Sequence, residues 1–128
     1  MQVKLLKFNI FKDDSGSLLP ISFKKELPFK IKRIFIIFGK KKFVRSKHAH
    51  IKSKQIYIPL NGKIKVIINK EKEYVLDKKK KQSLFVPKKT WTELFFEKDE
   101  DSLLVLTNTE YFQNDYIRNY NEFKKLRK

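Results

Sequence analysis

The stretch QIYIPLNGKIKVIIN, residues 55–69, decides the fold. Apolar and polar residues alternate along most of it with a period of two, which is typical of a β-strand that buries one face. Asn61-Gly62 divides the stretch, and this dipeptide between two alternating runs is the strongest short signal for a β-hairpin. The stretch therefore predicts two antiparallel strands joined at Asn61-Gly62.

The same alternation recurs on both sides of this stretch, and charged, turn-like segments separate the runs. The further candidate strands are Val3–Phe11, Leu18–Phe23, residues 28–38 (PFKIKRIFIIF), Glu73–Leu76, Leu84–Val86, Thr92–Phe96 and Leu103–Thr107. Eight or nine short strands at this spacing favour an all-β sandwich or jelly roll. Only residues 113–128 look helical. No repeat or linker divides the chain, so we expect a single domain over 1–128.

The composition bounds the class of protein. Hydrophobic residues make up 41% of the 128 residues, and twelve are Phe, which is enough to fill one core. There is no cysteine, which excludes disulfides, thiolate metal sites and thiol nucleophiles. The longest apolar run, Ile34–Phe38, is far shorter than the roughly 18 residues of a membrane helix. The first residues lack the features of a secretory signal, so we expect a cytoplasmic protein without a membrane.

The net charge of +17 comes from 31 Lys and Arg against 14 Asp and Glu. An excess of this size suits an acidic partner such as nucleic acid, a membrane surface or a phosphorylated ligand. Many of the lysines, however, alternate with apolar residues along strands, as on the wet face of a sheet. Nucleic-acid binding by a sheet needs aromatic residues interleaved with lysine on an exposed face, and Phe35 and Phe38 lie in a strand too apolar for that. We therefore expect no nucleic-acid partner.

Both histidines of the protein lie in one tripeptide, His48-Ala49-His50. Residues i and i+2 of a strand point to the same face, so the two imidazoles converge on one spot. Histidine is the side chain best suited to proton transfer near neutral pH. The alternative is a pair of surface histidines in a basic loop.

The residues that follow resemble the motifs of the cupins. His50 is followed by four residues, Gln55, six residues and Gly62, as in a first cupin motif, and a second motif would begin near Pro87. A metal-binding cupin uses a carboxylate and a third histidine where this chain has Gln55 and Thr92. An amide and a hydroxyl are poor substitutes for these ligands. We therefore expect no metal, which leaves His48 and His50 free for acid–base work.

A more specific resemblance covers most of the chain. The sequence is similar to the sugar nucleotide 3,4-ketoisomerases, small cupins that act on dTDP-4-keto-6-deoxyglucose. The matching segments are Asp13, Ser15–Leu18, Pro28–Phe35, Arg45–His50, Leu60–Gly62, Pro87, Trp91–Glu93, Tyr111, Asp115–Tyr120 and Phe123. The histidine tripeptide alone would be weak evidence, but together with the strand before it and the tail after it the pattern is fairly specific.

The resemblance implies a cupin jelly-roll, an antiparallel β-barrel with a short C-terminal helix. It implies an isomerase that forms a dTDP-3-keto-6-deoxyhexose through an enediol, in the biosynthesis of dideoxyamino sugars such as those of O-antigens in lipopolysaccharide. His48 would take the proton from C3 and His50 would shuttle protons or return one to C4, although the order of these roles is open. The family further implies a homodimer with exchanged N-terminal strands, and neither a metal nor an organic cofactor.

Four other residues are candidates for binding the substrate. Arg45 and Arg33 would contact the diphosphate, because a guanidinium pairs with phosphate through two parallel hydrogen bonds. Gln55 would donate a hydrogen bond to the sugar. Glu93, the sole acidic residue of TWTELFF, would orient a histidine or contact substrate, or would merely face water.

The chain departs from the family pattern at a few places. Ser46 stands where the family has glycine, Phe35-Ile36 where it often has a tyrosine, Thr92 where it often has His or Arg, and Ser15 where it often has Arg or Tyr. Two other functions therefore stay open: a non-catalytic cupin that binds a sugar nucleotide, and a related 3,5-epimerase, which pairs one histidine with an Asp and a Tyr. In the tail, Tyr116 and Arg118 are expected to be structural.

Overall fold

The computed structural model describes residues 2–22 and 27–127. Its elements are, in chain order, β1 (Lys4–Lys7), β2 (Phe11–Asp13), β3 (Gly16–Leu18), β4 (Arg33–Phe38), β5 (Val44–His50), β6 (Gln55–Asn61), β7 (Lys63–Ile68), β8 (Lys72–Asp77), β9 (Gln82–Val86), β10 (Thr92–Phe96), β11 (Ser102–Thr107), a 3-10 turn η1 (Gln113–Asp115), β12 (Tyr116–Ile117) and α1 (Tyr120–Arg127). No helix in this part of the chain is long and apolar enough to cross a membrane.

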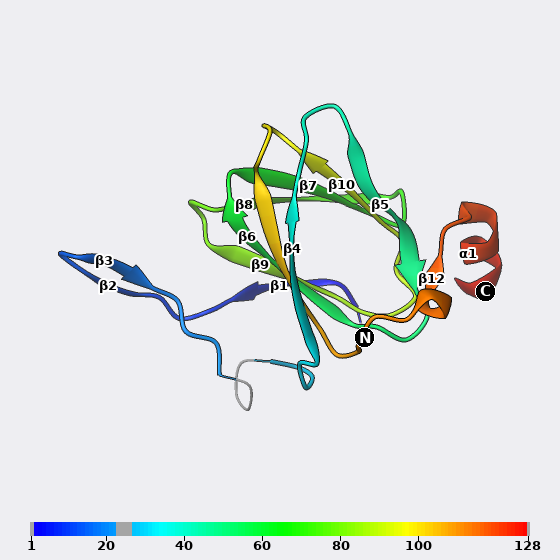
Figure 1. Cartoon of the computed structure of the whole chain (residues 1–128), viewed down its shortest axis with the longest axis horizontal. Coiled ribbons are helices and arrows are strands. Elements are labelled where there is room, and N and C mark those ends of the chain that lie inside the picture. Colours follow the sequence, from blue (N-terminus) through cyan, green and yellow to red (C-terminus); the bar gives the residue numbers. More distant parts are fainter. Residues whose placement is uncertain (1, 23–26, 128) are drawn as a thin grey trace.

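Two five-stranded antiparallel sheets form the body of the molecule (Figure 1). The first sheet has the order β1-β9-β6-β11-β4, and the second has the order β12-β5-β10-β7-β8. β2 and β3 form a separate hairpin that projects away from both sheets (Figure 1). The all-β jelly-roll class with a short C-terminal helix is confirmed, although the two sheets are not closed into a barrel.

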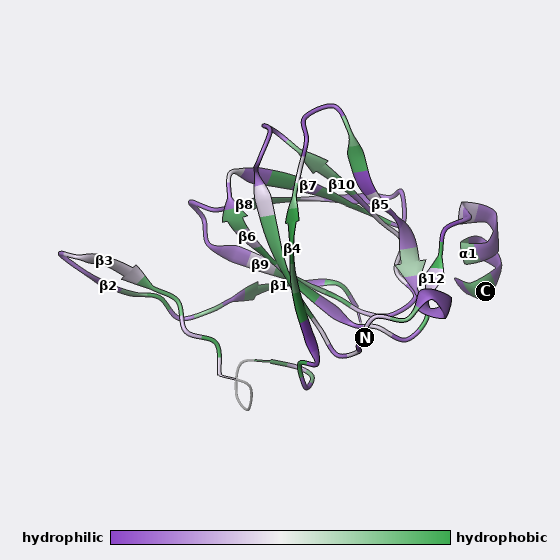
Figure 2. Ribbon diagram, in the orientation of Figure 1, coloured by the Kyte–Doolittle hydropathy of each residue, from purple (hydrophilic) through white to green (hydrophobic). Residues whose placement is uncertain are grey.

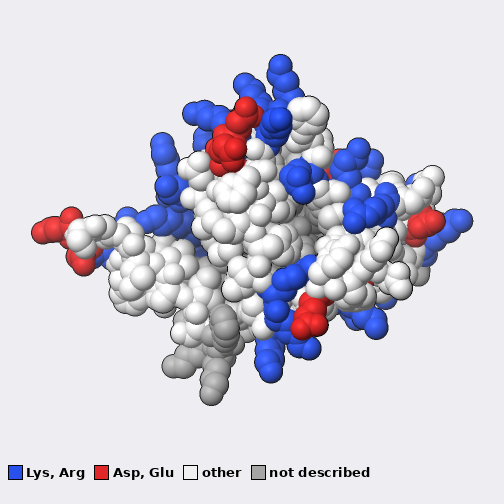
Figure 3. Space-filling model, viewed as in Figure 1, with Lys and Arg blue, Asp and Glu red and all other residues white. Residues whose placement is uncertain are grey.

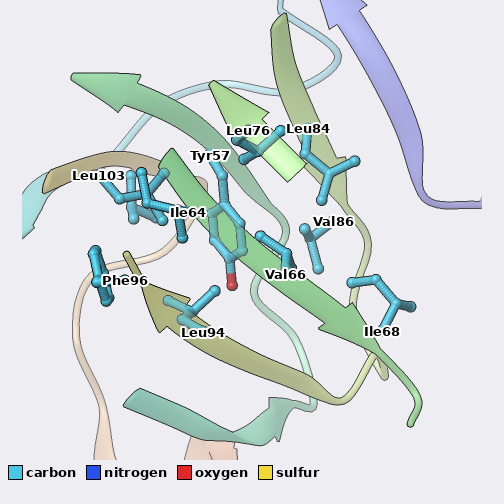
Figure 4. Close-up of a cluster of buried hydrophobic side chains, with 11 residues drawn as sticks. Tyr57, Ile64, Val66, Ile68, Leu76, Leu84, Val86, Leu94, Phe96 and Leu103 are labelled. Atoms are coloured by element: carbon cyan, nitrogen blue, oxygen red, sulfur yellow. The ribbon is translucent and has the colours of Figure 1, made fainter. Parts of the chain in front are cut away.

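The main core lies between the two sheets, and the alternation in the sequence explains it. Along β7, Ile64, Val66 and Ile68 are buried, while Lys63 and Lys65 lie on the other face. The remaining members of this core are Tyr57, Leu76, Leu84, Val86, Leu94, Phe96, Leu103 and Val105 (Figure 4). Figure 2 shows the same division, with green segments along the strands and purple in many of the connecting loops. Each strand thus places every second side chain in the core.

The first sheet is apolar on its outer face as well. Ile56, Ile58, Phe85 and Leu106 are buried there. They are covered by apolar side chains of the segment between β1 and β4, namely Phe8, Leu19, Ile21, Leu27, Phe29 and Ile31. This is why the first five residues of β6 are all buried.

The predicted hairpin at Asn61-Gly62 is wrong, although both of its strands exist. β6 pairs with β9 and β11 in the first sheet, whereas β7 pairs with β8 and β10 in the second, so Gly62 is the corner at which the chain changes sheet. The backbone of Gly62 has φ +74°, and a Cβ atom there would lie 2.1 Å from Cγ of Asp101. Asp101 accepts hydrogen bonds from the amides of Lys63 and Lys98 at 3.4 and 3.1 Å. Because β9 and β11 occupy both edges of β6, β7 has no edge to pair with.

The predicted N-terminal strands are only partly correct. The strand expected over Val3–Phe11 is formed at Lys4–Lys7, and Phe11 begins the β2–β3 hairpin. The strand expected over Leu18–Phe23 does not form at residues 19–22, where Leu19 and Ile21 pack on the outer face of the first sheet instead of pairing. Phe23 lies outside the described residues.

The tail differs from the single helix expected over residues 113–128. η1 and β12 come first, and the helix begins at Tyr120. β12 pairs with β5, with Tyr116 opposite His50 and Ile117 opposite Ala49. Phe123 of α1 then packs against Ala49 and Trp91 in a small core of its own. The tail is therefore part of the second sheet.

Candidate active site

A β-bulge in β5 sets the direction of the two histidines. His48 is opposite Thr92 of β10 and Ser46 is opposite Glu93, so Lys47 is an extra residue in β5. Ser46 and Lys47 have φ angles of +72° and +55°, in the left-handed region that L-residues seldom adopt. A bulge bends its strand and re-aims the side chains beside it, and bulges are common next to active sites.

His48 and His50 both line a cavity of about 470 Å³ between the two sheets. Their ring centroids are 4.9 Å apart, with the ring planes nearly perpendicular. The other polar residues of the lining are Arg45, Ser46, Gln55, Tyr57, Tyr116 and Arg118. The predicted convergence of the two imidazoles on one spot is thus present in the structure.

His50 is held by a buried carboxylate. Its Nδ1 lies 2.7 Å from Oδ2 of Asp115, and the two residues are 6% and 1% exposed. The carboxylate of Asp115 also accepts hydrogen bonds from the amide of Lys52 at 2.7 Å and from the amide and hydroxyl of Ser53. Because an ionised carboxylate only accepts hydrogen bonds, Nδ1 of His50 carries the proton and Nε2 keeps its lone pair.

His48 has a different partner. Its Nε2 lies 3.3 Å from Oγ of Ser46, which in turn contacts Oγ1 of Thr92 at 2.5 Å. The Tyr57 hydroxyl lies 3.4 Å from the same Oγ1 atom and 3.2 Å from Oε1 of Gln55. Nδ1 of His48 is buried without a hydrogen-bond partner among the described residues. His48 therefore faces a chain of hydroxyl groups, whereas His50 faces a carboxylate.

Burial keeps both imidazoles neutral at pH 7. Burial, together with the smaller effects of His50 and Arg118, lowers the pKa of His48 to about 3. Burial also lowers the pKa of His50, and the hydrogen bond that His50 donates to Asp115 opposes this effect only in part. For Asp115, burial raises the pKa, but the hydrogen bonds from Ser53, Lys52 and His50 together hold it below its usual value. A neutral imidazole beside an ionised carboxylate is able to accept a proton.

These shifts predict that acid destabilises the folded protein. Below about pH 6.5 the histidines of the unfolded chain bind protons that the folded chain does not bind, so stability falls with pH by up to about 1.4 kcal/mol per pH unit for each histidine. For His48 this loss continues down to about pH 3. We expect the melting temperature to decrease from pH 6.5 to 4.5, and to decrease less in His48→Asn. A melting temperature independent of pH over this range would contradict the lowered pKa values.

The structure brings two of the four predicted substrate-binding residues to the cavity, Arg45 and Gln55. Arg33 does not line it, since its guanidinium lies over the rings of Phe35 and Tyr111 at 5.1 and 5.6 Å, although its charge lowers the pKa of His50. Glu93 is also outside the cavity lining. β10 alternates, so the buried Thr92 and Leu94 leave Glu93 on the opposite face.

Glu93 has structural partners on that face. Its carboxylate accepts a hydrogen bond from Nε1 of Trp91 at 3.0 Å and lies 3.8 Å from Nζ of Lys70. Neither partner is a histidine. The expectation that Glu93 orients a histidine is therefore wrong.

Sequence analysis missed three residues of the site, all of them in the tail. Asp115 holds His50, Tyr116 packs against both imidazoles with ring centroids 4.6 and 4.9 Å away, and Arg118 lines the cavity with its guanidinium 4.7 Å from the Tyr116 ring. Tyr116 and Arg118 were expected to be structural only. The available signal was the run Asp115-Tyr116-Ile117-Arg118 itself, which puts a carboxylate, a phenol and a guanidinium within four residues.

The site has few groups for a metal ion. Within residues 2–22 and 27–127, no three His, Asp or Glu side chains come together as a ligand set. Gln55 and Thr92 stand near the histidines, as their spacing in the sequence predicts.

Comparisons of the sequence and of the structure with known proteins point to the same family. Residues 1–128 match the model of the family FdtA, described as WxcM-like, C-terminal. The chain is 36% identical to a TDP-4-oxo-6-deoxy-alpha-D-glucose-3,4-oxoisomerase of Aneurinibacillus thermoaerophilus, over 98% of this chain and 92% of that protein. A solved 3,4-ketoisomerase from Helicobacter canadensis is 35% identical and superposes with a TM-score of 0.92, over 98% and 97% of the two chains.

A third similar protein is the 3,4-ketoisomerase QdtA from Thermoanaerobacterium thermosaccharolyticum. It was solved as a histidine-to-asparagine mutant in complex with TDP-4-keto-6-deoxyglucose. The identity is 34% and the TM-score 0.88, over 97% of this chain and 92% of that one.

Proposed function

The chain belongs to the FdtA family, the sugar nucleotide 3,4-ketoisomerases, and on that premise we propose that it converts dTDP-4-keto-6-deoxyglucose into a dTDP-3-keto-6-deoxyhexose. The observation that carries this proposal is the pair of neutral imidazoles, His48 and His50, in one cavity with ring centroids 4.9 Å apart. An isomerisation between neighbouring carbons needs groups that remove a proton on one carbon and return one to the next.

The proton on C3 of the substrate is acidic because it lies next to the C4 carbonyl. A neutral imidazole takes this proton, O4 gains one, and the product is an enediol. Loss of the proton from O3 and addition of a proton at C4 then give the 3-ketone, so that no atom is gained or lost overall. We assign the first step to His48 and the later transfers to His50.

We propose that arginine and Gln55 bind the rest of the substrate. Arg45 lines the cavity and is exposed, so it can reach both an enediolate and the diphosphate at the mouth. Arg33 is close enough to His50 to act on it by charge, so a diphosphate contact from Arg33 would require its guanidinium to leave Phe35 and Tyr111. If Arg45→Ala left both dTDP affinity and its dependence on salt unchanged, the diphosphate would lie elsewhere.

The proposed reaction can be followed by proton NMR of dTDP-4-keto-6-deoxyglucose with the protein in heavy water. We expect signals of a 3-keto sugar, together with loss of the C3 proton signal of the substrate and deuterium at C4 of the product. A binding protein without catalytic activity would leave the spectrum unchanged. In that case the proposed function is wrong.

One observation favours a second candidate, the related 3,5-epimerase. His50 is paired with Asp115 and lies beside Tyr116, and the epimerase reaction uses a histidine, an aspartate and a tyrosine. The same NMR experiment separates the two reactions. An epimerase exchanges the protons on C3 and C5 for deuterium and leaves the ketone at C4.

We also propose that the protein works as a homodimer. Ile34, Ile36 and Phe38 form an exposed apolar row on β4, the edge strand of the first sheet, and the surface over β4 is largely free of charged side chains (Figure 3). Phe11 and Leu18 of the projecting hairpin are 60% and 62% exposed. Apolar surface of this kind usually marks an interface. Sedimentation of a single species near 15.5 kDa would contradict a dimer.

The chemistry of the product indicates which class of reaction consumes it. A ketone at C3 can react with the amino donor of an aminotransferase, which gives a 3-amino sugar. We propose that the protein acts in the synthesis of dideoxyamino sugars for O-antigens or related lipopolysaccharides, and that it does so in the cytoplasm.

A further inference from the structure

We propose that Asp115 is a positioning residue for His50. It holds the imidazole in the tautomer with the proton on Nδ1, so that Nε2 offers a lone pair to the cavity. This inference rests on the proposed function for its catalytic consequence, but the tautomer is a property of the resting protein.

The contacts of Asp115 leave one possible arrangement of protons. Oδ1 accepts hydrogen bonds from the amides of Lys52 and Ser53, at 2.7 and 3.3 Å. Oδ2 accepts hydrogen bonds from the Ser53 hydroxyl and from Nδ1 of His50. A carboxylate surrounded by donors stays ionised, and the imidazole nitrogen facing it must donate.

The backbone makes this pair rigid. β12 follows Asp115 directly and pairs with β5, with Tyr116 opposite His50. The amide of Ile51 also donates to the carbonyl oxygen of Asp115, at 2.8 Å. Main-chain hydrogen bonds on both sides therefore keep the carboxylate and the imidazole at a fixed separation.

The pair makes the two histidines unequal. A proton on His50 would face an ionised carboxylate, whereas a proton on His48 would face only the Ser46 hydroxyl. The other charged and titratable groups around His50 are Arg33, Arg118, His48 and Tyr116. The two arginines lower its pKa, so Asp115 is the group that favours protonation of His50. His50 is thus the imidazole better suited to hold a proton during the later transfers, which we assign to it.

Asp115→Asn tests this role. The amide oxygen can replace Oδ1 as acceptor for the two backbone amides, which turns the NH₂ group toward Nδ1 of His50. That contact moves the ring proton to Nε2 and replaces the lone pair facing the cavity with a donor. We expect kcat to fall by about 10²–10⁴ with KM nearly unchanged, because the substrate contacts remain. Nitrogen-15 NMR of the imidazoles should show the Nδ1–H tautomer in the unmodified protein and the Nε2–H tautomer in the variant.

Asp101→Asn is the matched control. Asp101 is 4% exposed and accepts hydrogen bonds from backbone amides, as Asp115 does, but it lies against Gly62 and not against a histidine. We expect it to lower the melting temperature and to leave the pH dependence of kcat and the His50 tautomer unchanged. An Nε2–H tautomer of His50 in the unmodified protein would overturn the inference, even if Asp115→Asn did not fold. If the unmodified protein showed the expected tautomer but no isomerisation, the proposed function would fail and the positioning role would stand.

Discussion

Replacing His48 by asparagine is expected to lower kcat by about 10²–10⁴, the usual effect of removing a positioned acid–base group. Asparagine is similar in size and polar, so the cavity stays filled and dTDP affinity should stay nearly the same. The C3 proton should also stop exchanging with solvent deuterium, because the neutral imidazole that removes it is gone. Turnover and deuterium wash-in at C3 are both measured by NMR in heavy water.

Two further variants make this result specific. His50→Asn should also lose turnover, and deuterium entering C3 without any 3-keto sugar would place His50 in the second half of the reaction. Lys47→Asn is the matched control, because it is the same substitution one residue away, at an exposed position of the bulge where asparagine tolerates a positive φ angle. Full activity of His48→Asn would contradict its role as base, and full activity of the double histidine variant would remove the reaction from this site.

Gly62→Ala is expected to lower the stability of the folded protein strongly. The residue has φ +74°, which costs an alanine about 1–2 kcal/mol, and its Cβ would lie 2.1 Å from Cγ of the buried Asp101. Moving that carboxylate leaves the amides it binds unsatisfied, at a cost of about 1–3 kcal/mol. Together these effects amount to about 3 kcal/mol, or a decrease in melting temperature on the order of 10 °C for a domain of this size.

Gly16→Ala separates backbone strain from lack of space. Gly16 has φ +140°, also a conformation unfavourable for alanine, but no atom lies within 4 Å of the added Cβ. The position is in the exposed β2–β3 hairpin, so the decrease in melting temperature should be much smaller. Equal losses for the two variants would mean that the contact with Asp101 is unimportant.

Alternation in the sequence predicted the strands but not their partners. Thr92–Phe96 forms a strand with the predicted bounds, because its side chains truly alternate between core and surface. The Asn61-Gly62 signal is local, whereas sheet membership depends on contacts distant in sequence, such as the one between Gly62 and Asp101. A period of two reveals which face of a strand is buried and carries no information on the strand beside it.

As with the fold, the sequence predicted only part of the candidate active site. His48 and His50 could be found from their spacing, and Arg45 and Gln55 from the family pattern. Asp115 belongs to the family pattern, but its contact with His50 could not be inferred, because 65 residues separate the two and a two-residue strand brings them together. A strand of two residues is too short to show an alternation of apolar and polar residues, so its pairing with β5 could not be inferred from the sequence.

Because β12 follows β5 and all strands of the main core in the sequence, the site is completed late during translation. His50 leaves the ribosome well before Asp115, and at about 5–20 residues per second the 65 intervening positions take roughly 3–13 s. During that interval β5 lacks its neighbour at one edge and the His50 imidazole lacks its hydrogen-bond acceptor. A nascent chain stalled before Asp115 would carry the strands of the main core and both histidines, but not the group that fixes the His50 proton. A polypeptide that ends before Asp115 would therefore contain the strands of the main core but would lack the carboxylate that positions His50.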